Sequence, residues 1–313
     1  MRRAARFLVL LTIVGGMGAS LHAQTRPDRS DEWLRRPVDN RTFRTYLSFF
    51  TYEATLPFET QMLESDELEG IRREHLSFQT TPGLRAFGRI YHAAAPAGGA
   101  LGWIIHLHGG TQRAKDGPGD RYIATFLARA GWNVLAIDML YFGERGTGLF
   151  TTYTDPEKHA RLYNQPSTYL AWVSQTVKDV GRAFDLLVKE RGADPGRIAL
   201  VGFSRGAEVA MVVGGADRRI AAVVSLYGGH FDALETGHLP AACPANYIGR
   251  IAPRPLLMVN GTQDTDFDRE AAVLPLQRLA RKPSQFIWVE TGHTVPPAAT
   301  MPEIIRWLAE NVK

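Results

Sequence analysis

The chain has 313 residues, of which 45% are hydrophobic and 22% charged, and it contains a single cysteine. These values are near the globular average and exclude a wholly disordered or collagen-like protein. The one cysteine, Cys243, excludes an intramolecular disulfide framework and a metal site built from several thiolates. The formal net charge of +4 would fit an acidic partner such as nucleic acid or anionic lipid if it belonged to the folded domain.

The first 23 residues have the three-part pattern of a secretory signal peptide. Arg2, Arg3 and Arg6 precede an apolar run over residues 7–14, and small residues lead to a cleavage site after Ala23. An uncleaved membrane anchor is the alternative, but the run is shorter than the about 20 apolar residues that a bilayer requires. We therefore expect an exported protein, periplasmic or secreted, with no stable membrane anchor after cleavage.

Most of the basic excess belongs to this leader. Without its three arginines the 36 basic residues become 33 against 32 acidic ones, so the net charge falls to +1. A nearly neutral mature chain gives no reason to expect nucleic acid as a partner. The oligomeric state is left open.

The rest of the chain alternates between strand-like and helix-like stretches. Residues 24–40 are polar and contain proline, which predicts a flexible lead-in to a domain over residues 41–313. An antiparallel hairpin is expected at residues 75–80 and 84–92. Buried parallel strands are expected at residues 102–107, 133–137, 197–202, 221–226, 255–259 and 285–289. Helices are expected at residues 120–130, 174–191, 205–214, 269–280 and 302–312. This alternation predicts an open α/β sheet with helices on both faces.

Residues 143–173 form a connection longer than usual, which predicts a functional loop or a small lid. Its aromatic side chains either line a substrate pocket or form the apolar underside of the lid. They are Phe150, Tyr153, Tyr163, Tyr169 and Trp172.

A G-x-S-x-G motif spans Gly202 to Gly206, between a predicted strand and a predicted helix. In this motif the serine lies in a strained turn that presents its hydroxyl above the sheet, and the glycines leave room for the close backbones. Ser204 is therefore predicted to be a nucleophile. The alternative is an ordinary strand-to-helix turn with an inert serine.

An oxyanion hole needs two backbone N–H groups near the nucleophile. We expect one from Arg205, directly after Ser204, and the other from Gly110 in the run His108-Gly109-Gly110. The alternative is that this glycine-rich run only forms the turn that ends a strand and has no catalytic role. His106 and His108 are expected to pack or brace the loop. A zinc pair formed by these two histidines has no third ligand at a recognisable spacing.

The remaining triad members follow in the order serine, acid, histidine. Asp264 lies on the loop after the strand at 255–259, with Asp266 and Asp268 as competitors. Asp264 is preferred because it is nearest the strand end, where the chain is most rigid. His293 lies on the loop between the last strand and the last helix, so we expect it to take the proton from Ser204. A surface histidine without a catalytic role is the alternative.

The chain resembles the α/β-hydrolase superfamily from about residue 75 onward, and within it the secreted dienelactone-hydrolase-like and acetyl-esterase-like serine hydrolases. The resemblance rests on several short motifs together: His108-Gly-Gly, Ile137-Asp138, Phe142 to Gly146, Asp194 to Ile198, Gly202 to Gly206, Arg254-Pro255, Gly261 to Asp264 and Gly292-His293. It implies an eight-stranded, mostly parallel sheet and triad roles for Ser204, Asp264 and His293. Dienelactone hydrolases proper use a cysteine nucleophile, so Ser204 favours hydrolysis of carboxylic esters over the namesake reaction.

The sequence thus predicts a serine hydrolase that cleaves small-molecule esters through an acyl-enzyme and requires no cofactor or metal. The first alternative is a serine peptidase of the same fold, because the same triad serves amides. The second is a hydrolase-fold binding protein without activity. The identity of the ester is left open.

Overall fold

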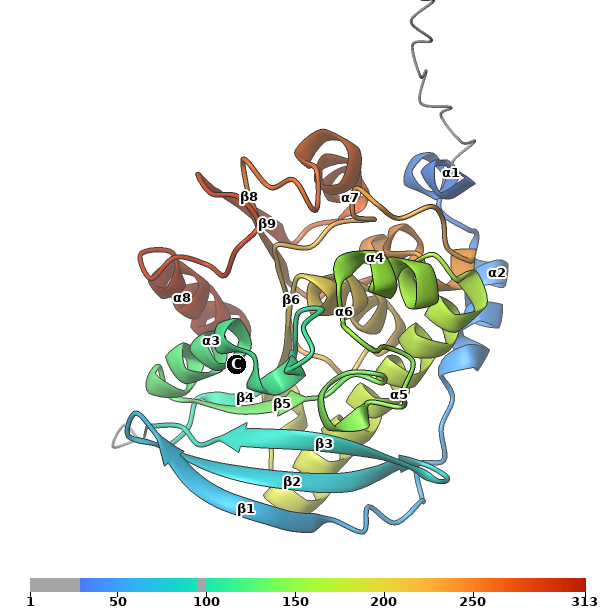
Figure 1. The fold of residues 1–313 in the computed structure, drawn as a ribbon. Coiled ribbons are helices and arrows are strands. Elements are labelled where there is room, and N and C mark those ends of the chain that lie inside the picture. The colour runs from blue at the N-terminus through green and yellow to red at the C-terminus, as the bar shows by residue number, and fades with distance from the viewer. Residues whose placement is uncertain (1–28, 95–98) are drawn as a thin grey trace, which may run out of the picture.

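A computed structural model describes residues 29–94 and 99–313, so the predicted signal peptide lies outside the described residues. Its central element is a sheet of nine strands in the order β1-β2-β3-β5-β4-β6-β7-β8-β9 (Figure 1). The strands are β1 (Gln61–Leu68), β2 (Ile71–Thr81), β3 (Leu84–Tyr91), β4 (Gly102–Leu107), β5 (Trp132–Ile137), β6 (Ile198–Phe203), β7 (Val223–Leu226), β8 (Leu256–Gly261) and β9 (Ser284–Val289).

The sheet is mixed. Strands β1, β2, β3 and β5 pair antiparallel, whereas β5, β4, β6, β7, β8 and β9 run parallel. This confirms the predicted hairpin and the mostly parallel α/β sheet. The carboxyl ends of the parallel strands meet at one edge, which is where open α/β sheets bind ligands.

The expected count of eight strands is corrected to nine. The sequence prediction missed β1, an edge strand that pairs only with β2. Its residues are mostly exposed, including Met62 and Leu63, and its acidic side chains follow no apolar alternation. A strand paired on one side and exposed on its faces needs no hydrophobic pattern, so the usual sequence signal is absent.

Helices cover both faces of the sheet. They are α1 (Arg29–Arg35), α2 (Asn40–Leu47), α3 (Pro118–Arg129), α4 (Asp155–Lys158), α5 (Pro166–Arg191), α6 (Arg205–Ala216), α7 (Leu274–Leu279) and α8 (Met301–Asn311). Figure 1 shows α3 and α8 together on one side of the sheet and α5 and α6 on the other. Two hydrophobic clusters match this division, one containing side chains of α5 and α6 and one containing those of α3 and α8. Within the described residues, no helix has both the length and the apolar character needed to cross a membrane.

Two stretches differ from the sequence expectation. Within the predicted flexible lead-in at residues 24–40, the structure forms α1, whose Trp33 and Leu34 pack against the core. Helix α5 begins at Pro166, eight residues before the predicted start at Ser174. Proline is favoured at the first helical position, where its missing N–H costs no hydrogen bond, so this residue begins the helix instead of excluding it.

The insertion at residues 143–173 contains the short helix α4 and ends in the first residues of the long helix α5. Helix α4 continues into a π-helical turn, η4 (His159–Tyr163), before α5 begins. Of the five aromatic residues noted in its sequence, Tyr163 lines a cavity that Ser204 and His293 also line. The side chains of Phe150, Tyr169 and Trp172 are instead buried in the core, so most of these aromatics anchor the insertion to the body.

Candidate active site

Ser204 lies in the turn between β6 and α6. Its φ of 52° and ψ of −116° are sparsely populated for a residue with a side chain. Two glycines allow this turn: a Cβ on Gly202 would overlap the backbone of Gly206, and a Cβ on Gly206 would overlap the backbone of Leu107. The side chain of Ser204 is thereby held at the carboxyl edge of the sheet.

Replacing Gly206 with alanine is expected to lower the free energy of unfolding by about 2–3 kcal/mol, because the new methyl group meets the main chain of β4 instead of a movable side chain. Thermal unfolding followed by circular dichroism measures this loss. Gly292→Ala is the matched control from the same edge of the sheet, since its Cβ would meet nothing nearer than 3.6 Å. Equal melting temperatures for the two variants would contradict the packing argument.

The structure brings together the three residues predicted to form the triad. The hydroxyl Oγ of Ser204 lies 2.9 Å from Nε2 of His293, and Nδ1 of the same ring lies 2.9 Å from a carboxylate oxygen of Asp264. The other oxygen of Asp264 accepts the N–H groups of Asp266 and Phe267, at 2.9 and 3.0 Å. Asp264 is thus fixed by backbone donors, and it in turn fixes the histidine ring.

The two competing acids occupy different positions. The carboxylate of Asp266 is 58% exposed and lies 3.8 Å from Nε2 of His293, the nitrogen that faces Ser204. Asp268 accepts the N–H of Ala271 and caps the π-helical turn η9 (Arg269–Val273). Only Asp264, among these three acids, contacts Nδ1 of His293.

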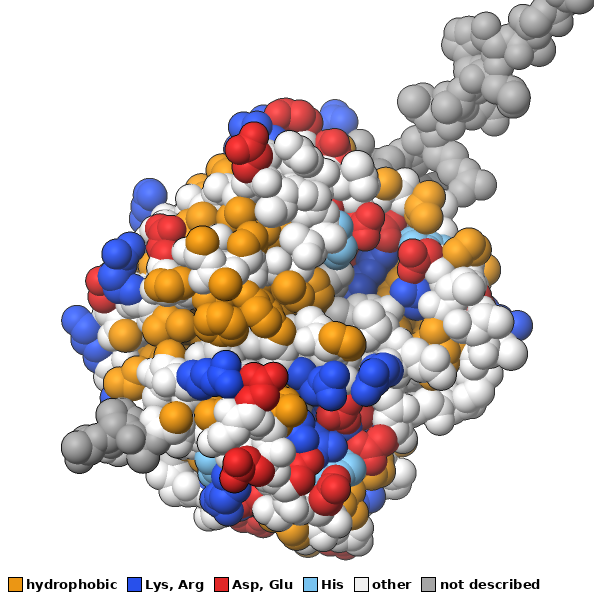
Figure 2. Space-filling model, turned by 60° about the vertical axis from the view of Figure 1, so that its left-hand side comes forward, with side chains coloured by type: hydrophobic (Ala, Val, Ile, Leu, Met, Phe, Trp, Pro, Cys, Tyr) orange, Lys and Arg blue, Asp and Glu red, His pale blue; other side chains and the backbone are white. Residues whose placement is uncertain are grey.

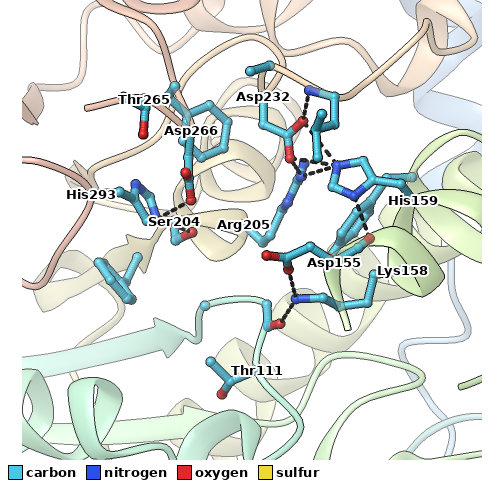
Figure 3. A pocket seen from close by; sticks show the side chains of 17 residues that line it. Thr111, Asp155, Lys158, His159, Ser204, Arg205, Asp232, Thr265, Asp266 and His293 are labelled. Atoms are coloured by element: carbon cyan, nitrogen blue, oxygen red, sulfur yellow. Dashed lines mark hydrogen bonds and ion pairs between the residues drawn. The ribbon is translucent and has the colours of Figure 1, made fainter. Parts of the chain in front are cut away.

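A cavity of about 440 Å³ opens beside Ser204. Figure 3 shows Asp155, Lys158 and His159 of the insertion on one side of it and Ser204 and His293 on the other. On the face drawn in Figure 2, acidic, basic and histidine side chains gather in a hollow next to an apolar area. The cavity wall therefore carries charges of both signs as well as aromatic and small side chains.

Both residues predicted to supply oxyanion donors line this cavity. Arg205 is the first residue of α6, where a helix leaves its N–H groups without intrahelical partners. The carbonyl oxygen of Gly110 accepts a hydrogen bond of 2.7 Å from Nζ of Lys158, which ties the Gly110 loop to the insertion. The N–H of Gly109, in contrast, is donated to the buried carboxylate of Asp120 at 3.2 Å.

The side chain of Arg205 is buried in an ionic network that sequence reasoning did not find. Its guanidinium donates to Glu208 at 3.1 Å and also to the carboxylates of Asp232 and Glu235. The carboxylate of Asp232 also lies 2.8 Å from Nε2 of His159. The network therefore joins the turn at Ser204 to the insertion and to the loop after β7.

Burial and the contacts within this network shift the pKa values of its members in opposite directions. Burial raises the pKa of Glu208 well above its usual value, and the charge of Glu235 adds to the increase. Burial also acts on Asp232 and Glu235, but hydrogen bonds and the charge of Arg205 outweigh it and lower the pKa of both. Despite burial, the hydrogen bond to Asp232 raises the pKa of His159.

The two histidines on β4 and the following loop have bracing roles. His106 lies between the carbonyl oxygen of Val201 and the carboxylate of Asp120, and it is fully buried. Nε2 of His108 accepts the N–H of Met139 at 2.9 Å, so its proton is on Nδ1 and the ring is neutral. Burial lowers the pKa of His108, in agreement with the neutral form.

Among the described residues, one group has the spacing to hold a metal ion: Glu208, Glu235 and His238. The guanidinium of Arg205 already donates to both carboxylates. A cation therefore occupies the position that a metal would take, and these residues do not fit a metal site.

The sequence matches the dienelactone hydrolase family over residues 116–286, more than half of the chain. The chain belongs to this family. The matched segment contains Ser204 and Asp264, and His293 follows it on the loop after β9. Family membership makes the protein an α/β-hydrolase whose relatives hydrolyse ester bonds. A comparison with curated proteins found no match.

Solved structures of the same fold include several esterases. A cold-adapted esterase from an Arctic intertidal metagenomic library is 18% identical, with a TM-score of 0.61, and the match covers 81% of this chain and all of that one. Acetyl xylan esterase 1 from Thermoanaerobacterium sp. JW/SL YS485 is 15% identical, with a TM-score of 0.64 and coverage of 90% and 98%. Acetyl xylan esterase from Paenibacillus sp. R4 is 15% identical, with a TM-score of 0.65 and coverage of 90% and 99%. At these identities the similarity establishes the fold.

Proposed function

We propose that the protein is a serine hydrolase that cleaves small carboxylic esters through an acyl-enzyme. The observation that carries the proposal is the hydrogen-bonded chain from Ser204 through His293 to Asp264 at the wall of an open cavity. These three groups have the roles of nucleophile, general base and orienting acid in acyl transfer. Membership of the dienelactone hydrolase family and the esterases among the similar structures support the same reaction class.

In the first step, Oγ of Ser204 attacks the ester carbonyl while Nε2 of His293 takes its proton. Asp264 accepts a hydrogen bond from Nδ1, holds the correct tautomer and stabilises the imidazolium. The negative charge that develops on the carbonyl oxygen is met by the N–H groups of Gly110 and Arg205. Collapse of this intermediate expels the alcohol, which receives the proton from His293.

In the second step, water attacks the acyl group on Ser204, and His293 takes one of its protons. The acid leaves when the proton returns to Oγ of Ser204. Every proton moves through Nε2 of His293, which lies 2.9 Å from that oxygen. The protein's own residues therefore complete the cycle.

Labelling with a fluorophosphonate probe tests this proposal directly, because only an activated serine reacts. We expect mass spectrometry to find the label on Ser204, with hydrolysis of p-nitrophenyl acetate lost in parallel. A parallel assay with a peptide anilide tests the peptidase alternative. Absence of labelling together with absence of esterase activity would instead favour the inactive binding protein.

The charged wall of the cavity favours short acyl groups, since a long alkyl chain would remove charged side chains from water. We expect the rate to fall from acetyl to octanoyl in a series of p-nitrophenyl esters. An increase in rate along the series would point to a lipid ester instead.

Replacing Asp264 with asparagine is expected to lower kcat by about 10²–10⁴-fold, because the amide cannot orient and stabilise the imidazolium as the carboxylate does. Asp266→Asn is the matched control two residues away, and we expect less than about a threefold change in its kcat, because Asp266 does not contact Nδ1. Both values come from steady-state hydrolysis of p-nitrophenyl acetate. The assignment of the acid fails if Asp266→Asn has the larger effect.

The protein is also proposed to act outside the cytoplasm, on the basis of the leader pattern at residues 1–23. Expression of the full chain in a bacterial host, followed by N-terminal sequencing of the exported protein, tests this. A mature chain that begins at Gln24 is the expected result. A chain that stays in the cytoplasm with its leader attached would contradict it.

A further inference from the structure

A second cavity lies at the opposite end of α6 from Ser204. Its volume is about 570 Å³, which exceeds the 440 Å³ of the cavity beside the nucleophile. The 12 residues of α6 span about 18 Å at 1.5 Å per residue, so the two cavities are separate. The second cavity is bordered by α2, by the loop after α6, by the turn η8 (Ile248–Arg250) and by the loop before β9.

Four arginines from these four segments line the second cavity, and among the residues that the structure describes no acidic one does so. They are Arg44, Arg218, Arg250 and Arg281. Across residues 29–94 and 99–313, no ion pair links any of these four arginines to a carboxylate. Three of them, Arg44, Arg218 and Arg281, are exposed, so their guanidinium groups are free to turn toward a ligand.

Arg250 forms a fixed base for the cavity. Its guanidinium lies 4.1 Å from the centre of the Phe43 ring. All its hydrogen bonds go to neutral acceptors, namely the carbonyl oxygens of Asn246 and Val38 and the side-chain oxygen of Asn40. Burial lowers the pKa of Arg250, and the positive charge of Arg281 lowers it further. The negative charge of Asp39 opposes these two effects but does not outweigh them.

The nearby acids are engaged elsewhere. Asp39 accepts the N–H of Thr42 and caps α2. Asp217, which precedes Arg218, pairs with Arg219. Neither acid forms an ion pair with an arginine of the cavity, so the guanidinium groups there keep free positions for an anionic ligand.

Arginine pairs with phosphate and carboxylate groups through two parallel hydrogen bonds, and it is the residue most suited to their recognition. A single anionic group would satisfy one or two of the four guanidinium groups. We propose that this cavity binds a soluble multivalent anion, a small molecule with two or more phosphate or carboxylate groups. The ligand would bridge the four segments that border the cavity and relieve the repulsion between their charges.

Isothermal titration calorimetry of the full chain with tripolyphosphate tests the proposal. We expect saturable binding at one site per chain. The double variant Arg218→Gln/Arg281→Gln is expected to bind at least about tenfold more weakly, because two charge-assisted contacts are lost. Both residues are exposed, so the fold is expected to persist, which circular dichroism checks.

The double variant Arg113→Gln/Arg306→Gln is the matched control, since it removes the same charge from exposed positions outside this cavity that have no ion pair within the described residues. We expect it to bind tripolyphosphate as the natural chain does. Equal weakening in both double variants would mean that the affinity for tripolyphosphate depends only on the net charge of the protein. The proposal would then be overturned. Lack of saturable binding by the natural chain would overturn it as well.

Discussion

Ester hydrolysis is expected to fall by about 10⁴-fold or more when Ser204 is replaced by alanine, while the fold is retained. The hydroxyl of Ser204 lies at the cavity and 2.9 Å from Nε2 of His293. Without it, the proposed acyl-enzyme cannot form. The measurement is kcat for p-nitrophenyl acetate, combined with thermal unfolding of both proteins.

Ser225 supplies a matched control for this substitution. It is fully buried on β7, next to β6 in the sheet, and its hydroxyl has no hydrogen-bond partner within residues 29–94 and 99–313. Ser225→Ala should therefore leave the activity near that of the natural chain. Full activity in Ser204→Ala would overturn the assignment of the nucleophile, whereas loss of activity in both variants would indicate a general loss of packing.

The sequence predicts Ser204 and His293 as site residues because each follows a strand with a strong local signal, and the structure places the two side chains within hydrogen-bond distance. The glycines around Ser204 identify the turn by their spacing alone, since a side chain at Gly202 or Gly206 would overlap the main chain. The choice between Asp264 and Asp266 was weaker. It depends on a turn in which two N–H groups bind the carboxylate of Asp264, and a sequence does not display such backbone geometry.

Two elements of the fold, strand β1 and the start of helix α5, were also not predicted from the sequence. The buried strands were predictable because burial on both faces requires continuous apolar residues. Strand β1 has exposed apolar residues such as Met62 and Leu63 among acidic ones, so only its pairing with β2 defines it as a strand. The first two turns of α5 fall in the stretch 143–173 that the sequence assigns to a long connection, although Pro166 is well suited to begin a helix.

The partners of Arg205 in its ionic network could not be predicted from the sequence. Its members come from the insertion, from α6 and from the loop after β7, and no local pattern connects His159 with Asp232. One sequence feature nevertheless indicates that Arg205 has acidic partners. Arg205 directly follows the nucleophile, at a position that must be buried when α6 packs under the cavity, and a buried arginine requires acidic partners.

Replacing Arg205 with methionine is expected to lower the free energy of unfolding by about 3–5 kcal/mol, since the buried carboxylates of Asp232 and Glu235 lose their cation. For a chain of this size, such a loss lowers the melting temperature by about 10 °C. Differential scanning calorimetry provides the measurement. Arg219→Met is the matched control, because Arg219 also contacts two acids but is 39% exposed, and it should cost less than about 1 kcal/mol.

The pH dependence separates this electrostatic effect from a simple loss of packing. In the natural chain the pKa values of Asp232 and Glu235 are lowered, so their stabilising contribution is present above their unfolded pKa values, near 4, and is lost as the pH falls through the folded values. Without the guanidinium, the contacts with His159 and His238 are left to oppose burial, so both pKa values rise relative to the natural chain and the carboxylates take up protons at a higher pH. The difference in melting temperature between Arg205→Met and the natural chain should therefore be largest near pH 7 and shrink toward pH 4.5. A difference that stays constant over this range would mean that Arg205 acts through its packing and not through its charge.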